Sequence, residues 1–325
     1  MEDNIFEQRL DLDGLTQSVA TIRQEINKVI IGQTKMLDLI IIGLLCDGHI
    51  LIEGVPGVAK TLTAKIMAKI IDVDFSRMQF TPDLMPSDVV GTAVFNSKEG
   101  EFNFKAGPIF SNIVLIDEIN RAPAKTQAAL FEVMEERQVT VDGTTYEMRF
   151  PFIIVATQNP IEQEGTYRLP EAQLDRFIFK IDVQYPSLQE EISILNSQHG
   201  KSQATLLQSV QKVLSPIELL QFRSIIQNVI VEDKLIEFIA KIVNETRNNP
   251  ALYLGASPRA SLAILRASKA NAAIKGRDFV TPEDIKEMAL PVLRHRIILT
   301  PEKEMEGTTA DELIESILKT IEVPR

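Results

Sequence analysis

A glycine-rich segment near the start of the chain has the residue types and spacing of a phosphate-binding loop. It follows an apolar run at residues 50–52, precedes an apolar helical pattern, and reads Gly54-Val55-Pro56-Gly57-Val58-Ala59-Lys60-Thr61. Glycines let backbone N–H groups turn towards an anion, and a helix N-terminus adds partial positive charge. At this spacing a lysine reaches the β- and γ-phosphates of ATP, and the next hydroxyl binds Mg²⁺. We therefore expect Lys60 to contact phosphate and Thr61 to contact the metal, although Ala59 replaces the usual glycine.

Two further apolar runs end in side chains suited to hydrolysis. Residues 113–116 end in Asp117 and Glu118, and residues 153–156 lead to Asn159. In isolation the acids read equally well as a solvated loop, and an Asn before Pro is usually a turn former. Because they follow a phosphate loop in the chain, a functional role is favoured for them, since the carboxyl ends of parallel strands meet where ligands bind. We expect Asp117 to hold Mg²⁺, Glu118 to polarise the attacking water, and Asn159 to orient it.

The elements that must position these residues alternate along the first half of the chain. Helical apolar spacing opens the sequence at residues 15–29 and 36–44. Short apolar runs typical of buried parallel strands then recur between helical stretches, at residues 50–52, 75–80, 113–116, 152–156 and 177–183. Strands that alternate with helices predict an α/β fold with a doubly wound parallel sheet.

A change of texture after Tyr185 predicts a second domain. Beyond a polar stretch at residues 198–203 only helical patterns follow, with capping signals at residues 281–284 and 309–312. We place the boundary near residue 186, which predicts an ATP-binding core at 1–185 and a smaller helical domain at 186–325.

Composition and charge limit the partners and the location of the protein. The 325 residues are 45% hydrophobic and 24% charged, which is ordinary globular usage. The net charge is −11, and residues 1–185 carry 17 basic against 27 acidic side chains, which disfavours nucleic acid as a partner. The longest apolar run, residues 39–46, is too short to span a bilayer. An acidic start and a single cysteine, Cys46, fit the cytoplasm without membrane insertion.

Three motifs in this order resemble the MoxR family of AAA+ ATPases. They read QFTPDLMPSD at residues 79–88, DEINRAP at 117–123 and LPEAQLDRF at 169–177, and the resemblance extends over about residues 26–297. It implies a P-loop core with a five-stranded parallel sheet and helices on both faces, followed by an all-helical lid. It also implies ATP hydrolysis with Mg²⁺ in a ring, expected to be hexameric, that remodels or matures protein clients such as von Willebrand factor A domain proteins.

The same resemblance implies roles for individual residues. Residues 54–61, extended to Leu62, are similar to the Walker A loop, and Asp117 with Glu118 to the Walker B pair. The remaining assignments are Asn159 as the first sensor, Arg176 as the arginine finger offered to a neighbouring subunit with Arg168 as the alternative, Arg259 as the second sensor that reaches from the lid to the γ-phosphate, and residues 29–33, including Ile31, as the segment against adenine.

Two alternating segments predict β-hairpins added to this core, at residues 95–104 and 139–146. Their positions resemble inserts that face the pore and engage substrate in this clade, although a plain surface hairpin reads equally well. Two other functions within the clade stay open at this stage: a nucleic-acid motor, which the acidic core disfavours, and the motor subunit of a metal chelatase. A P-loop kinase for a small acceptor would leave Asn159, Arg176, Arg259 and the helical lid without a purpose.

Overall fold

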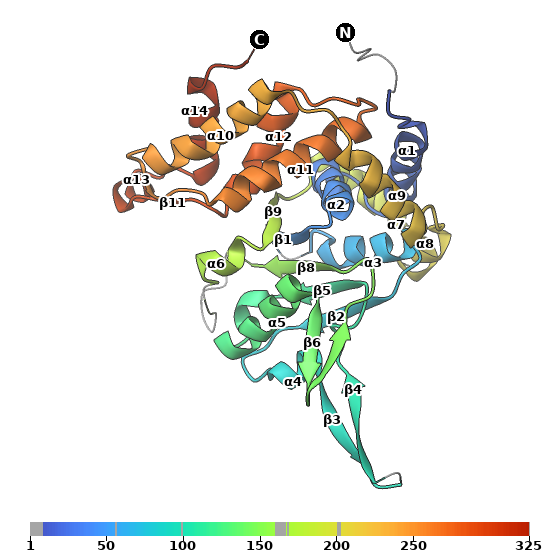
Figure 1. Cartoon of the computed structure of the whole chain (residues 1–325). Coiled ribbons are helices and arrows are strands. Elements are labelled where there is room, and N and C mark those ends of the chain that lie inside the picture. The colour runs from blue at the N-terminus through green and yellow to red at the C-terminus, as the bar shows by residue number, and fades with distance from the viewer. Residues whose placement is uncertain are drawn as a thin grey trace, which may run out of the picture.

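The structure is a computed structural model that describes residues 9–55, 57–98, 100–159, 167, 169–199 and 203–324. A central sheet carries most of the helices on one side, and two hairpins extend from the other side (Figure 1). No described helix is long and apolar enough to cross a membrane.

The centre is a five-stranded parallel sheet in the order β2-β5-β8-β1-β9. Its strands are the five predicted apolar runs, which confirms the predicted sheet: β1 (His49–Gly54), β2 (Phe75–Gln79), β5 (Ile113–Asp117), β8 (Ile153–Gln158) and β9 (Phe177–Val183). All five residues of β5 are buried, because helices cover both of its faces. The strand order places the ends of β5, β8 and β1 side by side.

The strands supply two separate cores, because successive side chains of a strand point to opposite faces. Ile50 and Ile52 belong to one core and Leu51 to the other. The first core takes in α1 (Asp13–Asn27), α2 (Thr34–Leu45) and α3 (Lys60–Ile70). The second is covered by α4 (Pro86–Val90), the 3₁₀ turn Ile119–Arg121 and α5 (Ala124–Glu136). Helices on both faces confirm the predicted fold class.

Both predicted hairpins are present. The first consists of β3 (Gly91–Asn96) and β4 (Glu101–Ala106), and it projects far from the sheet (Figure 1). The second consists of β6 (Gln138–Val141) and β7 (Thr144–Glu147), joined at Asp142 and Gly143, which both have positive φ as a tight hairpin turn requires. Phe104 stacks on Tyr146 with ring centroids 4.4 Å apart, so the two hairpins support each other.

The C-terminal region is helical, as predicted, with a minor addition. The short helix α6 (Glu171–Leu174) precedes β9 and belongs to the sheet domain. The helices of the C-terminal region are α7 (Leu188–Gln198), α8 (Gln203–Ser209), α9 (Pro216–Gln227), α10 (Asp233–Asn248), α11 (Pro258–Ile274), α12 (Pro282–Leu293), α13 (Pro301–Met305) and α14 (Ala310–Thr320). Both predicted caps form: Asp284 accepts from the Thr281 N–H, and Glu312 from the Thr309 N–H.

A short antiparallel pair, β10 (Leu252–Leu254) with β11 (Ile298–Leu299), adds to the expected helices. The region does not have a core of its own, because its buried side chains join those of α1 and α2 in one continuous cluster. Helix α11 packs against both of these N-terminal helices. The helical region is therefore held firmly to the sheet domain.

Candidate active site

The phosphate loop connects the end of β1 to the first turn of α3, at the carboxyl-terminal edge of the sheet. Gly57 has φ +88°, and Ala59 has φ 62°. Left-handed backbone of this kind lets neighbouring N–H groups converge on an anion, but it is unfavourable for a residue with a Cβ. At Gly54 a Cβ would lie 2.6 Å from the backbone oxygen of Val183, so only glycine fits there. Pro56 lies outside the described residues.

Lys60 is the first residue of α3, where the loop ends. Its Nζ donates to the Gly54 carbonyl oxygen at 2.6 Å, which folds the side chain back over the loop. Partial burial lowers the pKa of Lys60, and the nearby carboxylates of Asp117, Glu118 and Glu53 oppose that effect. The lysine therefore lies within the field of both predicted catalytic acids, which the sheet has brought to the same loop.

Asp117 is buried at the end of β5, with both carboxylate oxygens engaged. Oδ1 accepts from the Thr157 hydroxyl at 3.1 Å, and Oδ2 accepts from Arg77 Nε at 2.6 Å. Hydroxyl and carboxylate oxygens are the donors that Mg²⁺ prefers, so Asp117 with Thr61, in the first turn of α3, fits a magnesium ion. Within the described ranges no three His, Cys, Asp or Glu side chains form a metal-binding group, so phosphate and water would complete the shell.

Glu118 follows in a left-handed conformation, φ 57°, which directs it away from the strand. Its carboxylate accepts from Gln79 Nε2 at 2.7 Å and pairs with Arg121 Nε at 3.0 Å. Its side chain is 32% exposed, so water reaches it. Asn159 directly follows β8 at the same edge and is half-buried. The three predicted polar residues thus share one edge of the sheet.

Sequence reasoning missed three side chains that hold these acids in place. Thr157, on β8, donates to Asp117 and also accepts from the Glu118 backbone N–H at 3.1 Å. Arg77 and Gln79 reach across from β2, where Gln79 is in register with Asp117. The signal for this pair was alternation: two polar residues two positions apart at the end of a strand share one face. A hydroxyl two residues before Asn159 was the corresponding signal for Thr157.

The predicted adenine segment lies beside the carboxyl end of β9. Gln33 Nε2 donates to the Gln184 carbonyl oxygen at 2.9 Å, and a Cβ on Gly32 would collide with Glu190 of α7. Ile31 is half-buried next to them. Three other residues of the predicted nucleotide-binding segment are apolar and contribute to the first core. Val58 is buried in it, and Val55 and Leu62 are partly exposed and pack against it.

Arg176 and Arg259 lie together at the opposite, amino-terminal edge of the sheet. The hollow that they line also contains His49, the first residue of β1. Gly54, the last residue of the same strand, lies at the phosphate loop. With six residues in β1 and roughly 3.3 Å per residue, the two edges are about 17 Å apart. Arg259 was expected to reach from the lid to the γ-phosphate, but the structure places it with Arg176 and away from the loop of its own chain. Arg168 lies outside the described residues.

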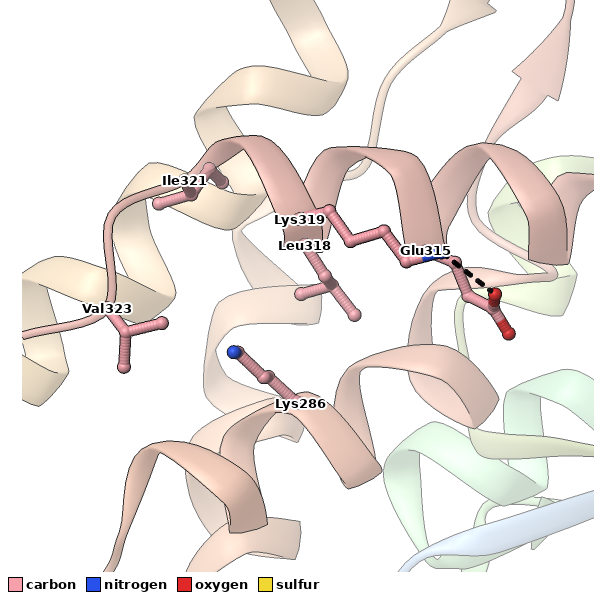
Figure 2. A pocket seen from close by; sticks show the side chains of 6 residues that line it. All are labelled: Lys286, Glu315, Leu318, Lys319, Ile321 and Val323. Atoms are coloured by element: carbon pink, nitrogen blue, oxygen red, sulfur yellow. Dashed lines mark ion pairs between the residues drawn. The ribbon is translucent and has the colours of Figure 1, made fainter.

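A second hollow lies between α12, α14 and the segment that follows α14, and its lining does not resemble a catalytic site (Figure 2). Lys286 points into it from α12, opposite Leu318, and Lys319 pairs with Glu315 at 3.8 Å along its rim. The residues that line it are aliphatic or singly charged, without a convergent set of polar groups. The candidate active site is therefore the carboxyl-terminal edge of the sheet.

The chain is similar to known proteins over most of its length. The model of the ATPase family associated with various cellular activities (AAA) matches residues 49–179, and the AAA lid domain model matches residues 244–317. YeaC, an uncharacterized protein of Bacillus subtilis, is 46% identical over 93% of both chains. The chaperone MoxR1 of Mycobacterium tuberculosis is 43% identical over 96% of this chain and 85% of its own. A crystal structure from Cytophaga hutchinsonii, provisionally described as an ATPase, superimposes with a TM-score of 0.88 at 43% identity, covering 96% and 97% of the two chains.

Proposed function

Because the chain belongs to the MoxR family of AAA ATPases, we propose that it is a Mg²⁺-dependent, ring-forming ATPase that remodels or matures protein clients. The observation that carries the ring is the separation of two sets of residues. The phosphate loop lies at one edge of the sheet and Arg176 at the other. One chain cannot bring the two together, but head-to-tail packing of identical chains can, and such packing forms a ring when the rotation between neighbouring subunits closes.

In this proposal the phosphate loop and Lys60 hold the β- and γ-phosphates. Thr61 and Asp117 hold Mg²⁺, which neutralises charge on the phosphate oxygens when it is bound. Glu118 accepts a proton from water that Asn159 orients, and Thr157 keeps both acids in place. Arg176 of the neighbouring subunit stabilises the negative charge that develops on the transferred phosphoryl group.

The projecting hairpin β3–β4 is the segment that we propose contacts clients. Val94, Phe95 and Phe102 are 47%, 54% and 71% exposed on it, and the two rings pair across the strands at 5.2 Å. Exposed aromatic side chains on a projecting element are typical of protein contact sites. The relative named as a chaperone supports protein clients. The resemblance of the sequence to the MoxR family adds von Willebrand factor A domain proteins as one class of client.

Three further parts of the proposal rest on sequence and chain layout. The boundary between core and lid lies near residue 186, between the end of β9 at Val183 and the start of α7 at Leu188. Nucleic acid is not a partner, since a net acidic core repels phosphates. The protein acts in the cytoplasm, without insertion into a membrane.

The test is ATP hydrolysis measured as phosphate release against protein concentration, with and without Mg²⁺. We expect specific activity to rise with concentration, because Arg176 acts only between subunits, and to disappear when EDTA removes the metal. Lys60→Ala should abolish ATP binding. Constant specific activity from dilute monomer to assembled protein, or normal turnover of the Lys60 variant, contradicts the proposal.

A further inference from the structure

Two of the arginines at the amino-terminal edge, Arg176 and Arg259, bind the same carboxylate. Glu135, near the end of α5, accepts from Arg176 Nη1 through Oε2 at 3.1 Å and from Arg259 Nη2 through Oε1 at 2.8 Å. Arg176 belongs to the sheet domain, and Arg259 lies in the first turn of α11 in the helical region. These three residues, which we call the arginine cluster, therefore connect the two regions through a single side chain.

The residue next to Arg176 is attached to the helical region as well. Asp175 Oδ2 accepts from the hydroxyl of Ser257, the N-cap of α11, at 2.9 Å. Asp175 Oδ1 accepts from Arg296 Nε at 2.7 Å, and the guanidinium of Arg296 is buried. The backbone of the Asp175-Arg176 segment thus follows the position of α11, and Glu135 aligns the Arg176 side chain with the same helix.

The guanidinium of Arg176 depends strongly on Glu135. Its Nη1 holds both of the contacts that fix it within the described chain, one to Glu135 and one to the Phe131 carbonyl oxygen at 2.7 Å. Its buried Nε has no hydrogen-bond partner among the residues that the structure describes. Without a carboxylate at position 135, two guanidinium groups would face each other with no shared counter-charge and would repel.

We propose that Glu135 is a positioning residue that orients Arg176 and Arg259 as one unit, so that the helical region sets the direction in which Arg176 is presented to a neighbouring subunit. This rests on the proposed function, in which Arg176 acts between subunits. Glu135 does not touch the nucleotide of its own chain, because it lies at the far edge of the sheet.

Glu135→Gln tests the proposal, since glutamine keeps the shape and removes the charge. We expect kcat to fall about tenfold or more, from the loss of charge-assisted bonds to both arginines, while KM for ATP stays unchanged. Glu135→Asp should recover part of kcat, because the shorter carboxylate keeps the charge. Glu136→Gln is the matched control: the neighbouring carboxylate is exposed, and its loss should leave both constants unchanged.

Mixing of variants shows in which subunit Glu135 acts. Lys60→Ala subunits keep the arginine cluster and should restore activity to Glu135→Gln subunits, whose phosphate loop is intact. Arg176→Ala subunits carry the same kind of defect as Glu135→Gln and should not restore it. A Glu135→Gln variant that keeps full kcat while Arg176→Ala is inactive overturns the inference and leaves the proposed function standing. Full activity of Arg176→Ala instead overturns the proposed function.

The helical side of the cluster supplies a second test that does not depend on the stability of the Glu135 variant. Arg259→Ala should lower kcat with KM unchanged and should likewise be restored by Lys60→Ala subunits. Combined with Glu135→Gln it should lower kcat no further than the stronger single change, since both break one unit. Independent, multiplying effects, or a fully active Arg259→Ala variant, would exclude control of Arg176 by the helical region.

Discussion

The two edges of the sheet are built in different ways. At the carboxyl-terminal edge, the loop after β1 and the acids after β5 lie close because the sheet order places β8 between these strands and the strands are parallel. At the amino-terminal edge, the defining contact joins Glu135 to Arg259, 124 positions along the chain. The first edge follows from backbone topology, and the second depends on how the helical region rests on the sheet.

The two edges therefore differ in what fixes the positions of their functional residues. Residues at the ends of buried parallel strands keep their relative positions as long as the sheet exists. The arginine cluster keeps its geometry only while α11 holds its place against α5. If Arg176 acts between subunits as we propose, the sheet alone fixes the nucleotide site, and its completion by a neighbouring chain depends on how the helical region packs on the sheet domain.

Loss of Arg176 is the largest expected effect and the sharpest test of the separation. Arg176→Ala should bind ATP normally but hydrolyse it about 10³- to 10⁵-fold more slowly, the range found for arginine fingers supplied by a partner. Nucleotide affinity should be measured with a fluorescent ATP analogue and turnover by phosphate release.

The control for Arg176 is its mixture with Lys60→Ala. Each variant damages a different edge, so interfaces that join an intact loop to an intact arginine should regain activity. A mixture that assembles, as shown by gel filtration, and yet stays inactive would mean that Arg176 serves only its own chain, and Arg168 would become the candidate.

Loss of the Glu118 carboxylate comes next in size and belongs to the other edge. Glu118→Gln should retain ATP binding and lose about 10²- to 10⁴-fold in kcat, the usual contribution of a general base. Mixing it with Lys60→Ala should not restore activity, since both damage the carboxyl-terminal edge. Restoration in that mixture would break the assignment of Glu118 to the same site as Lys60.

The contrast between the edges also explains how far the sequence could predict this molecule. The five strands, both hairpins and the helical C-terminal region followed from apolar periodicity and turn residues, which are local signals. The loop residues and acids followed from their place at strand ends. Glu135 could not be predicted, because nothing near it in the chain says that α5 ends beside Arg176 and the start of α11. The position of Arg259 was missed for the same reason.

Thr157 tests how rigid the carboxyl-terminal edge is. Its hydroxyl contacts both acid residues, and Thr157→Val has nearly the same volume but no hydroxyl. Kcat should fall about tenfold, since a hydrogen bond to a charged group is lost, and more Mg²⁺ should be needed for half-maximal activity. Thr157→Ser should restore both. Unchanged Mg²⁺ dependence in the valine variant would show that Asp117 keeps its position without this contact.

The smallest expected effect concerns Ala59, where the loop departs from the usual glycine. Alanine here has φ 62° and ψ 19°, and a Cβ in left-handed backbone is destabilising. Ala59→Gly should therefore raise the free energy of unfolding, by roughly 0.5–1 kcal/mol, even though glycine adds entropy to the unfolded chain. Ala128→Gly makes the same exchange at an exposed position inside α5 and should lower it by about 1 kcal/mol. Urea denaturation without nucleotide compares the two variants. If the free energy of unfolding rises in Ala59→Gly and falls in Ala128→Gly, the loop backbone is strained at Ala59 before any phosphate binds. If Ala59→Gly is destabilising to the same extent as Ala128→Gly, the positive φ carries no strain, and the alanine serves the loop as well as glycine would.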